Sequence, residues 1–184
     1  MNRCKLLIVA CCFLFPAQAF AAEPKVADLL ISNTPEHLVV YLKLENCFTE
    51  KMEEAILAGI PTTFTVILEL CRERRFWFDK KMSAHEVRNT IKYDNIKKIF
   101  YVLFSEEGKE PEQFKEFSEA KDVMAELNGV SLAPLTALTR GEQYYLRAKA
   151  KLDEVRLPLH LEYVFFFVSL WDFETDWARQ TFVY

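Results

Sequence analysis

Glycine, histidine and long uncharged segments are scarce in this sequence. Its 184 residues include four glycines and three histidines. Four scattered glycines provide no glycine-rich loop of the kind that binds a phosphate group. The histidines, His37, His85 and His160, lack the spacing of metal ligands, so no metal site is predicted. No segment after the N-terminus reaches the ~20 uncharged apolar residues that a membrane-spanning helix needs.

Recognised catalytic motifs are also absent. No serine lies in a G-x-S-x-G turn, and neighbouring acids such as Glu53 and Glu54 point apart rather than toward one substrate. The sequence therefore predicts no catalytic residue and no cofactor, and an enzyme is the least favoured function. The net charge of −4 argues against nucleic-acid binding and against a polybasic membrane-surface protein, because both need clustered cations.

The N-terminus has the layout of a secretory signal peptide. Two basic residues precede the apolar run Leu6–Phe15, and small residues follow it. We expect cleavage near Ala19 to Ala22. Residues 1–22 are then the signal peptide, and residues 23–184 form a single periplasmic domain.

Only Cys47 and Cys71 of the five cysteines lie outside this signal peptide. Export places them in an oxidising compartment, where a disulfide between them is chemically allowed. The alternative is two separate buried thiols that behave as small apolar side chains. The sequence leaves both states open.

The stretch Gly59–Leu70 organises the predicted fold. A short helix capped by Thr49 is expected to end at Gly59, and Pro61 prevents its continuation. The β-branched and aromatic run that follows predicts a central strand. After it come Phe76, Trp77 and Phe78, and the next three residues, Asp79-Lys80-Lys81, are predicted to turn the chain.

Alternating apolar and polar residues predict most of the other elements as strands. These are Val26–Ser32, Leu38–Glu45, Glu86–Asp94, Ile99–Phe104 and Tyr144–Leu152. A second helix is expected from a cap at Ser118 to Asn128-Gly129, followed by an edge strand or extended connection interrupted by Pro134. The segment Leu159–Leu170 fits a helix or a buried strand. The pattern predicts a mainly β, antiparallel β-sandwich-like domain with two or three short helices.

Two sets of residues are candidates for binding. Arg147, Lys149 and Lys151 share one face of their strand, as either a solvated surface or a docking surface for an acidic partner. Trp171 and Trp177 belong to an aromatic C-terminus that either packs on the core or binds an apolar ligand.

Several motifs together resemble one protein family. They are Gly59-Ile60-Pro61 before the aromatic strand, Leu146-Arg147-Ala148, Leu157-Pro158-Leu159, and the Trp171-Asp172-Phe173-x-Thr175-x-Trp177 run. Their order and spacing resemble an uncharacterised family of exported bacterial proteins, domain of unknown function 4390. The resemblance implies a cleaved signal peptide, no assigned catalysis, and an association with membrane sensor kinases.

These observations favour a non-enzymatic periplasmic binding or interaction domain, an accessory to an envelope signalling system. Its partner would be an envelope protein or membrane sensor. The alternative is a periplasmic protein that handles lipid or another apolar ligand. The sequence predicts neither the ligand, the strand order nor the oligomeric state.

Overall fold

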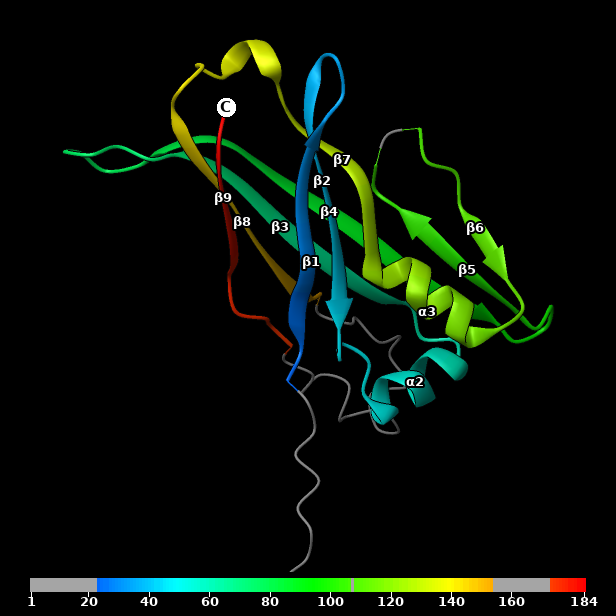
Figure 1. Ribbon diagram of the computed structural model, residues 1–184. Helices are drawn as coiled ribbons and strands as arrows, with labels where there is room; N and C mark the ends of the chain where they lie inside the picture. The colour runs from blue at the N-terminus through cyan, green and yellow to red at the C-terminus, as the bar shows by residue number, and fades with distance from the viewer. Residues whose placement is uncertain (1–22, 107, 154–172) are drawn as a thin grey trace, which may run out of the picture.

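Two antiparallel sheets face each other across one hydrophobic core (Figure 1). The computed structural model describes residues 23–106, 108–153 and 173–184. The predicted signal peptide, Trp171, His160 and the segment Leu159–Leu170 lie outside the described residues. Over the described part, the predicted mainly β, sandwich-like fold is confirmed.

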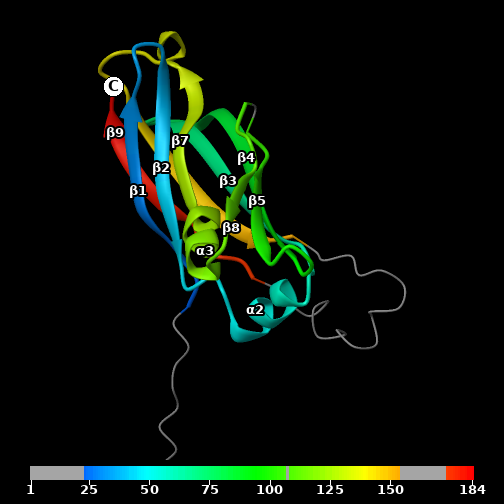
Figure 2. The ribbon, with the colours of Figure 1, turned by 90° about the vertical axis from the view of Figure 1, so that its right-hand side faces the viewer.

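The smaller sheet has the strand order β1-β2-β7 and the larger one β6-β5-β4-β3-β8-β9. The first comprises β1 (Lys25–Asn33), β2 (His37–Glu45) and β7 (Glu126–Pro134). The second comprises β3 (Thr62–Arg72), β4 (Lys80–Asp94), β5 (Ile99–Phe104), β6 (Glu112–Phe114), β8 (Gln143–Leu152) and β9 (Ala178–Val183). Two helices, α2 (Glu50–Leu57) and α3 (Phe117–Ala125), lie at one end of the sandwich (Figure 2), and a 3₁₀ turn (Leu135–Ala137) precedes β8.

Strand β3 is central, as its sequence predicts. It pairs with β4 on one side and β8 on the other. Phe64, Val66, Leu68 and Leu70 are buried on the face toward the smaller sheet. The alternate side chains of β2 and β8 complete that core, so the predicted two-face pattern of all three strands is confirmed.

Helix α2 also forms as predicted. The Thr49 hydroxyl accepts a hydrogen bond from the Met52 N–H at 3.3 Å, which caps the helix. Gly59 has a φ of +91°, and the Ile60 N–H donates to the Ala55 carbonyl at 3.0 Å. Helix α2 therefore ends in a residue with the left-handed backbone conformation, which glycine adopts most readily.

The second helix differs from its prediction at both ends. Helix α3 begins at Phe117, and no side chain caps it, so Ser118 is not the N-cap. It ends at Ala125 rather than at Asn128-Gly129, because β7 begins at Glu126 and pairs with β2. Asn89 of β4 donates a hydrogen bond to the Met124 carbonyl at 3.0 Å, which fixes that end on the core. Tertiary pairing thus decides the boundary against local propensity.

The predicted edge strand near Pro134 is β7, at the edge of the three-stranded sheet. The short strand β6 was not predicted. Neither α2 nor α3, the two α-helices of the described residues, is long and apolar enough to cross a membrane.

Candidate binding surface

One face of the six-stranded sheet points away from the smaller sheet, and we call it the open face. Its side chains alternate with the core residues of β4, β3, β8 and β9. The charged and polar members used below are Glu69, Cys71, Lys81, Arg88, Tyr145, Arg147, Lys149, Lys151 and Arg179. The open face therefore contains the basic stripe that the sequence predicts.

Glu69 is the centre of the open face. Its side chain is only 10% exposed, and it accepts bonds from Lys81 Nζ at 2.5 Å and from Arg147 Nη2 at 2.5 Å. Burial opposes ionisation of Glu69, but the hydrogen bonds from Lys81 and Arg147 outweigh it and lower the pKa of the carboxyl. The same bond raises the pKa of the Arg147 guanidinium. The Glu69 carboxylate is therefore paired with two cations, and the three groups together carry one net positive charge.

The structure brings Arg147, Lys149 and Trp177 together. The Arg147 guanidinium lies 4.6 Å from the centre of the Trp177 ring, and Lys149 Nζ lies 5.2 Å from it. Lys149 also pairs with Glu174, and Lys151 follows on the same face of β8. Two of the three cations of the predicted stripe, Arg147 and Lys149, are thus paired with acids from other segments.

The two cysteines lie on different sides of the six-stranded sheet, and both are free and buried. Cys47 belongs to the core between the sheets, where burial raises the pKa of its thiol to about 11. Cys71 faces the other way, paired in register with Tyr145 of β8. The structure therefore has two separate thiols, the second of the two states left open by the sequence.

The histidines of the described chain show no sign of metal binding. His85 donates from Nε2 to the Leu132 carbonyl at 2.7 Å, and this bond joins β4 to β7 across the sandwich. Within residues 23–106, 108–153 and 173–184, no group of three or more potential ligands could hold a metal ion.

The turn between β3 and β4 carries the most exposed aromatic residues of the described chain. Phe76, Trp77 and Phe78, which we call the aromatic tip, are 92%, 76% and 88% exposed. The hairpin carries them beyond the edge of the sandwich, at the left of Figure 1. The predicted turn at Asp79-Lys80-Lys81 is wrong, because Lys80 and Lys81 already belong to β4. The chain turns at residues 75–77, which include Phe76 and Trp77.

The base of this hairpin is fixed to the body of the domain. Glu73 accepts a bond from Arg179 of β9 at 2.8 Å. Asp79 accepts from the Tyr145 hydroxyl at 3.0 Å and from the Arg74 N–H at 3.1 Å. Burial, with hydrogen bonds that involve Cys71 and Asp79, raises the pKa of Tyr145 to about 12. Both acids of the hairpin therefore point back toward the sheet.

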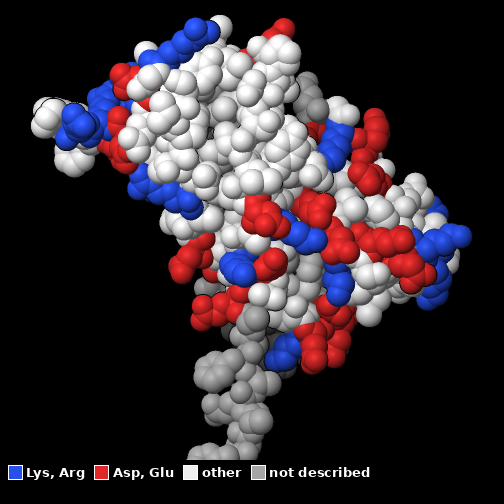
Figure 3. Space-filling model, viewed as in Figure 1, with Lys and Arg blue, Asp and Glu red and all other residues white. Residues whose placement is uncertain are grey.

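The cations of the hairpin are arranged differently. Arg74, Arg75 and Lys80 are exposed, and no ion pair joins them to another described residue. Blue side chains lie directly behind the white end of the hairpin in Figure 3. A signal for this arrangement was present in the sequence: three consecutive aromatics stand between two charged runs that connect two strands.

Comparison with known proteins places the chain in a family without assigning it a function. The family model described as "Domain of unknown function (DUF4390)" matches residues 21–181. The chain belongs to this family. No curated protein and no solved structure matches it. The resemblance read from the motifs of the sequence is confirmed at the level of the family.

Several clefts open on the described part of this DUF4390 domain. One, of about 690 Å³, lies at the base of the hairpin, lined by Glu73, Arg74, Arg75, Asp79, Gly141, Glu142 and Gln143. A second, of about 580 Å³, lies over β4 to β6, and a third, of about 320 Å³, lies near Cys47. Charged side chains contribute to the lining of all three clefts.

Proposed function

We propose that this DUF4390 domain is an exported, non-enzymatic binding domain of the periplasm. It attaches to a component of the cell envelope through the aromatic tip and serves as an accessory to an envelope signalling system. The observation that carries the proposal is the exposure of Phe76, Trp77 and Phe78 at 92%, 76% and 88%. Single exposed apolar residues are ordinary, but a contiguous exposed group marks an interaction site.

The free energy available at the tip is substantial. Full burial of one large apolar side chain is worth about 1.5–3 kcal/mol. These three side chains contribute little to the core of the domain. The free energy of burying them is therefore available to a bound partner. Aromatic residues also dominate the energetics of known interfaces because each buries a large area with few rotatable bonds.

The rest of the fold supports the presentation of this tip. Strands β3 and β4 pair along the whole hairpin, from Thr62 opposite Ile91 to Arg72 opposite Lys80. The contacts of Glu73 with Arg179 and of Asp79 with Tyr145 hold its base. A tip fixed in this way loses less conformational entropy on binding than a loose loop would.

The chemistry of the open face supports binding rather than catalysis. A general base that acts near neutral pH needs a pKa close to that pH. The pKa of Glu69 is shifted the other way, because Lys81 and Arg147 stabilise its ionised form. These charges hold neighbouring strands together, which supports a structural role for them.

The location and the partner class come from the sequence. The apolar run Leu6–Phe15 after two basic residues supports export. The family resemblance supports a role beside membrane sensor proteins. Attachment at the membrane side of the periplasm would place the domain where such a sensor could respond to it.

The alternative, a protein that carries lipid in an internal site, has less support. It rests on the C-terminal aromatics, and two of those described, Phe173 and Phe182, are already used in packing. Phe173 contacts the Phe64 ring at 5.4 Å, and Phe182 stacks on Tyr144 at 5.7 Å. Phe173 lies in the core and Phe182 packs against it, which leaves the tip as the better candidate.

Sedimentation with membranes isolated from the source organism tests the proposed function. The purified protein is expected to sediment with the membranes, and the F76A/W77A/F78A variant to remain in the supernatant. Ile96→Ala is the matched control, since Ile96 is 94% exposed in the turn between β4 and β5. Circular dichroism checks that each variant is folded. Equal binding of the triple variant and the control would refute the proposed function.

A further inference from the structure

We propose that the partner of the aromatic tip is the surface of an anionic lipid bilayer. This inference rests on the proposed function and names its partner. The three aromatic side chains enter the interfacial layer of the bilayer, while the cations behind them contact the anionic headgroups. The domain would then be a peripheral membrane protein held by one hairpin.

The shape and the chemistry of the tip suit a bilayer interface. The hairpin projects as a narrow end (Figure 1), and none of the three clefts described above is lined by Phe76, Trp77 or Phe78. A lipid bilayer is fluid and can deform around a convex apolar end of this kind. Tryptophan and other aromatic rings are enriched at membrane–water interfaces, and Trp and Phe recur in segments that lie in the interface.

The charges of the hairpin are sorted by sign. Glu73 and Asp79 are turned toward the body, where Arg179 and Tyr145 bind them. Arg74, Arg75 and Lys80 remain exposed beside the aromatic tip. The cations lie on both sides of the aromatics along the chain, so both sides of the tip would meet a negatively charged plane.

The local charge of the hairpin differs from the overall charge of the chain. The net charge of −4 predicts no attraction to an anionic membrane. Charges are screened over about 8–10 Å at ordinary ionic strength, so a surface close to the tip experiences the hairpin rather than the whole domain. The acids gathered near α3 in Figure 3 lie at the other end of the molecule.

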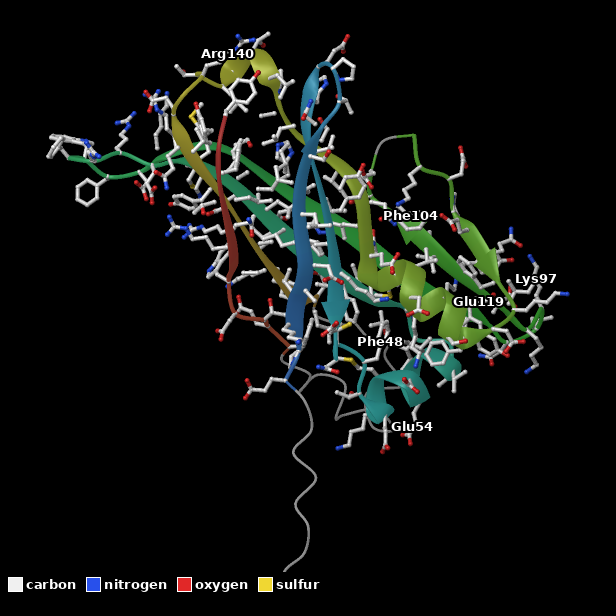
Figure 4. All side chains as sticks on the ribbon, in the orientation of Figure 1. Phe48, Glu54, Lys97, Phe104, Glu119 and Arg140 are labelled. Atoms are coloured by element: carbon white, nitrogen blue, oxygen red, sulfur yellow. The ribbon has the colours of Figure 1, made fainter. Side chains whose placement is uncertain are left out.

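The opposite end of β4 provides an internal control. Ile96 is 94% exposed there and is followed by Lys97 and Lys98. Figure 4 labels Lys97 at the right of the view, across the molecule from the aromatic tip. This turn has one apolar side chain instead of three, and Lys97 is engaged with the Tyr101 hydroxyl at 3.4 Å. The proposal predicts that this turn contributes little.

Flotation with protein-free vesicles tests the inference. The full protein is expected to bind vesicles of phosphatidylglycerol and phosphatidylethanolamine, and to bind phosphatidylcholine vesicles much more weakly. The F76A/W77A/F78A variant should bind about tenfold more weakly or worse, given the apolar area lost. The R75Q/K80Q variant should also bind more weakly, with less sensitivity to salt. Ile96→Ala should bind as the original protein does.

The emission of Trp77 reports insertion directly. Vesicles should shift tryptophan emission of the original protein to shorter wavelength. Trp77→Phe should still bind and should lose most of that shift, because Trp171 and Trp177 lie outside the tip. This variant keeps an aromatic side chain at the tip and separates insertion from a general structural change.

Different results would refute the bilayer as partner and the proposed function. Sedimentation with native membranes, without binding to protein-free anionic vesicles, would overturn the bilayer as partner and leave a membrane protein in its place. Vesicle binding that the triple aromatic variant retains would also overturn it. Absence of tip-dependent binding to native membranes would refute the proposed function itself.

Discussion

The carboxylate of Glu69 lies 2.5 Å from Arg147 Nη2, although the two residues are 78 positions apart in the sequence. The bond joins β3 to β8 on the open face, and Lys81 of β4 completes it from the other side. Three strands are thereby connected through one buried acid. This cluster has consequences for stability that can be measured.

Glu69→Gln is expected to destabilise the domain by about 1.5–3 kcal/mol at neutral pH, the usual range for a hydrogen bond to a charged group. The lowered pKa of Glu69 means that its contribution is present above the pKa of the unfolded state, about 4.3, and is lost as the pH falls through the lower folded pKa. Urea unfolding of both proteins from pH 7 down to pH 3 measures the difference.

Glu86→Gln is the matched control for that series. Glu86 pairs with Arg88 at 2.6 Å, but both side chains are about half exposed. Exposed pairs contribute about 0–1 kcal/mol, so this variant should change little at any pH. A Glu69→Gln effect no larger than that of the control would contradict the structural role assigned to the cluster.

Cys47 and Cys71 are expected to be unreactive free thiols in the folded protein. Both are buried, and burial raises the pKa of Cys47 to about 11, so little of the nucleophilic thiolate exists near neutral pH. Alkylation without reductant should modify both residues only after denaturation, as peptide mass spectrometry would show. A peptide that links Cys47 to Cys71 would establish the disulfide instead.

Gly59→Ala is expected to cost about 1–2 kcal/mol of folding stability, because an alanine is strained in the left-handed region. Gly59 has a φ of +91° where α2 ends, and an added Cβ would lie 3.0 Å from the exposed Asn95 amide, which can move aside. Gly59→Asn should cost less, since asparagine adopts this conformation more readily. Thermal unfolding of the two variants compares them, and an equal loss would argue against backbone strain as the cause.

The elements set by local chemistry could be predicted from the sequence. The cap at Thr49, the stop at Gly59 and the alternation of Leu38–Glu45 and Tyr144–Leu152 each follow from a few adjacent residues. Two-residue periodicity also assigns side chains to faces, which is why Arg147, Lys149 and Lys151 were expected on one side of their strand.

The features set by distant pairing could not be predicted. Helix α3 ends early because Glu126 joins β2 through a pairing that local propensity does not encode. The pairing of Arg147 with Glu69 depends on β3 and β8 being neighbours in the sheet, which the sequence leaves open. The turn at the aromatic tip was not predicted because Asp79 is a common turn residue, whereas Phe76, Trp77 and Phe78 are not.

Binding of Trp77→Asp to membranes isolated from the source organism tests the central claim most directly, with Ile96→Asp as the control. Both substitutions add one carboxylate to an exposed turn, and only one lies in the aromatic tip. The account predicts that Trp77→Asp weakens binding by about tenfold or more, because a charge would have to leave water. It predicts that Ile96→Asp stays within about twofold of the original protein, as surface changes usually do. Equal binding of the two variants would contradict the assignment of the aromatic tip as the binding element.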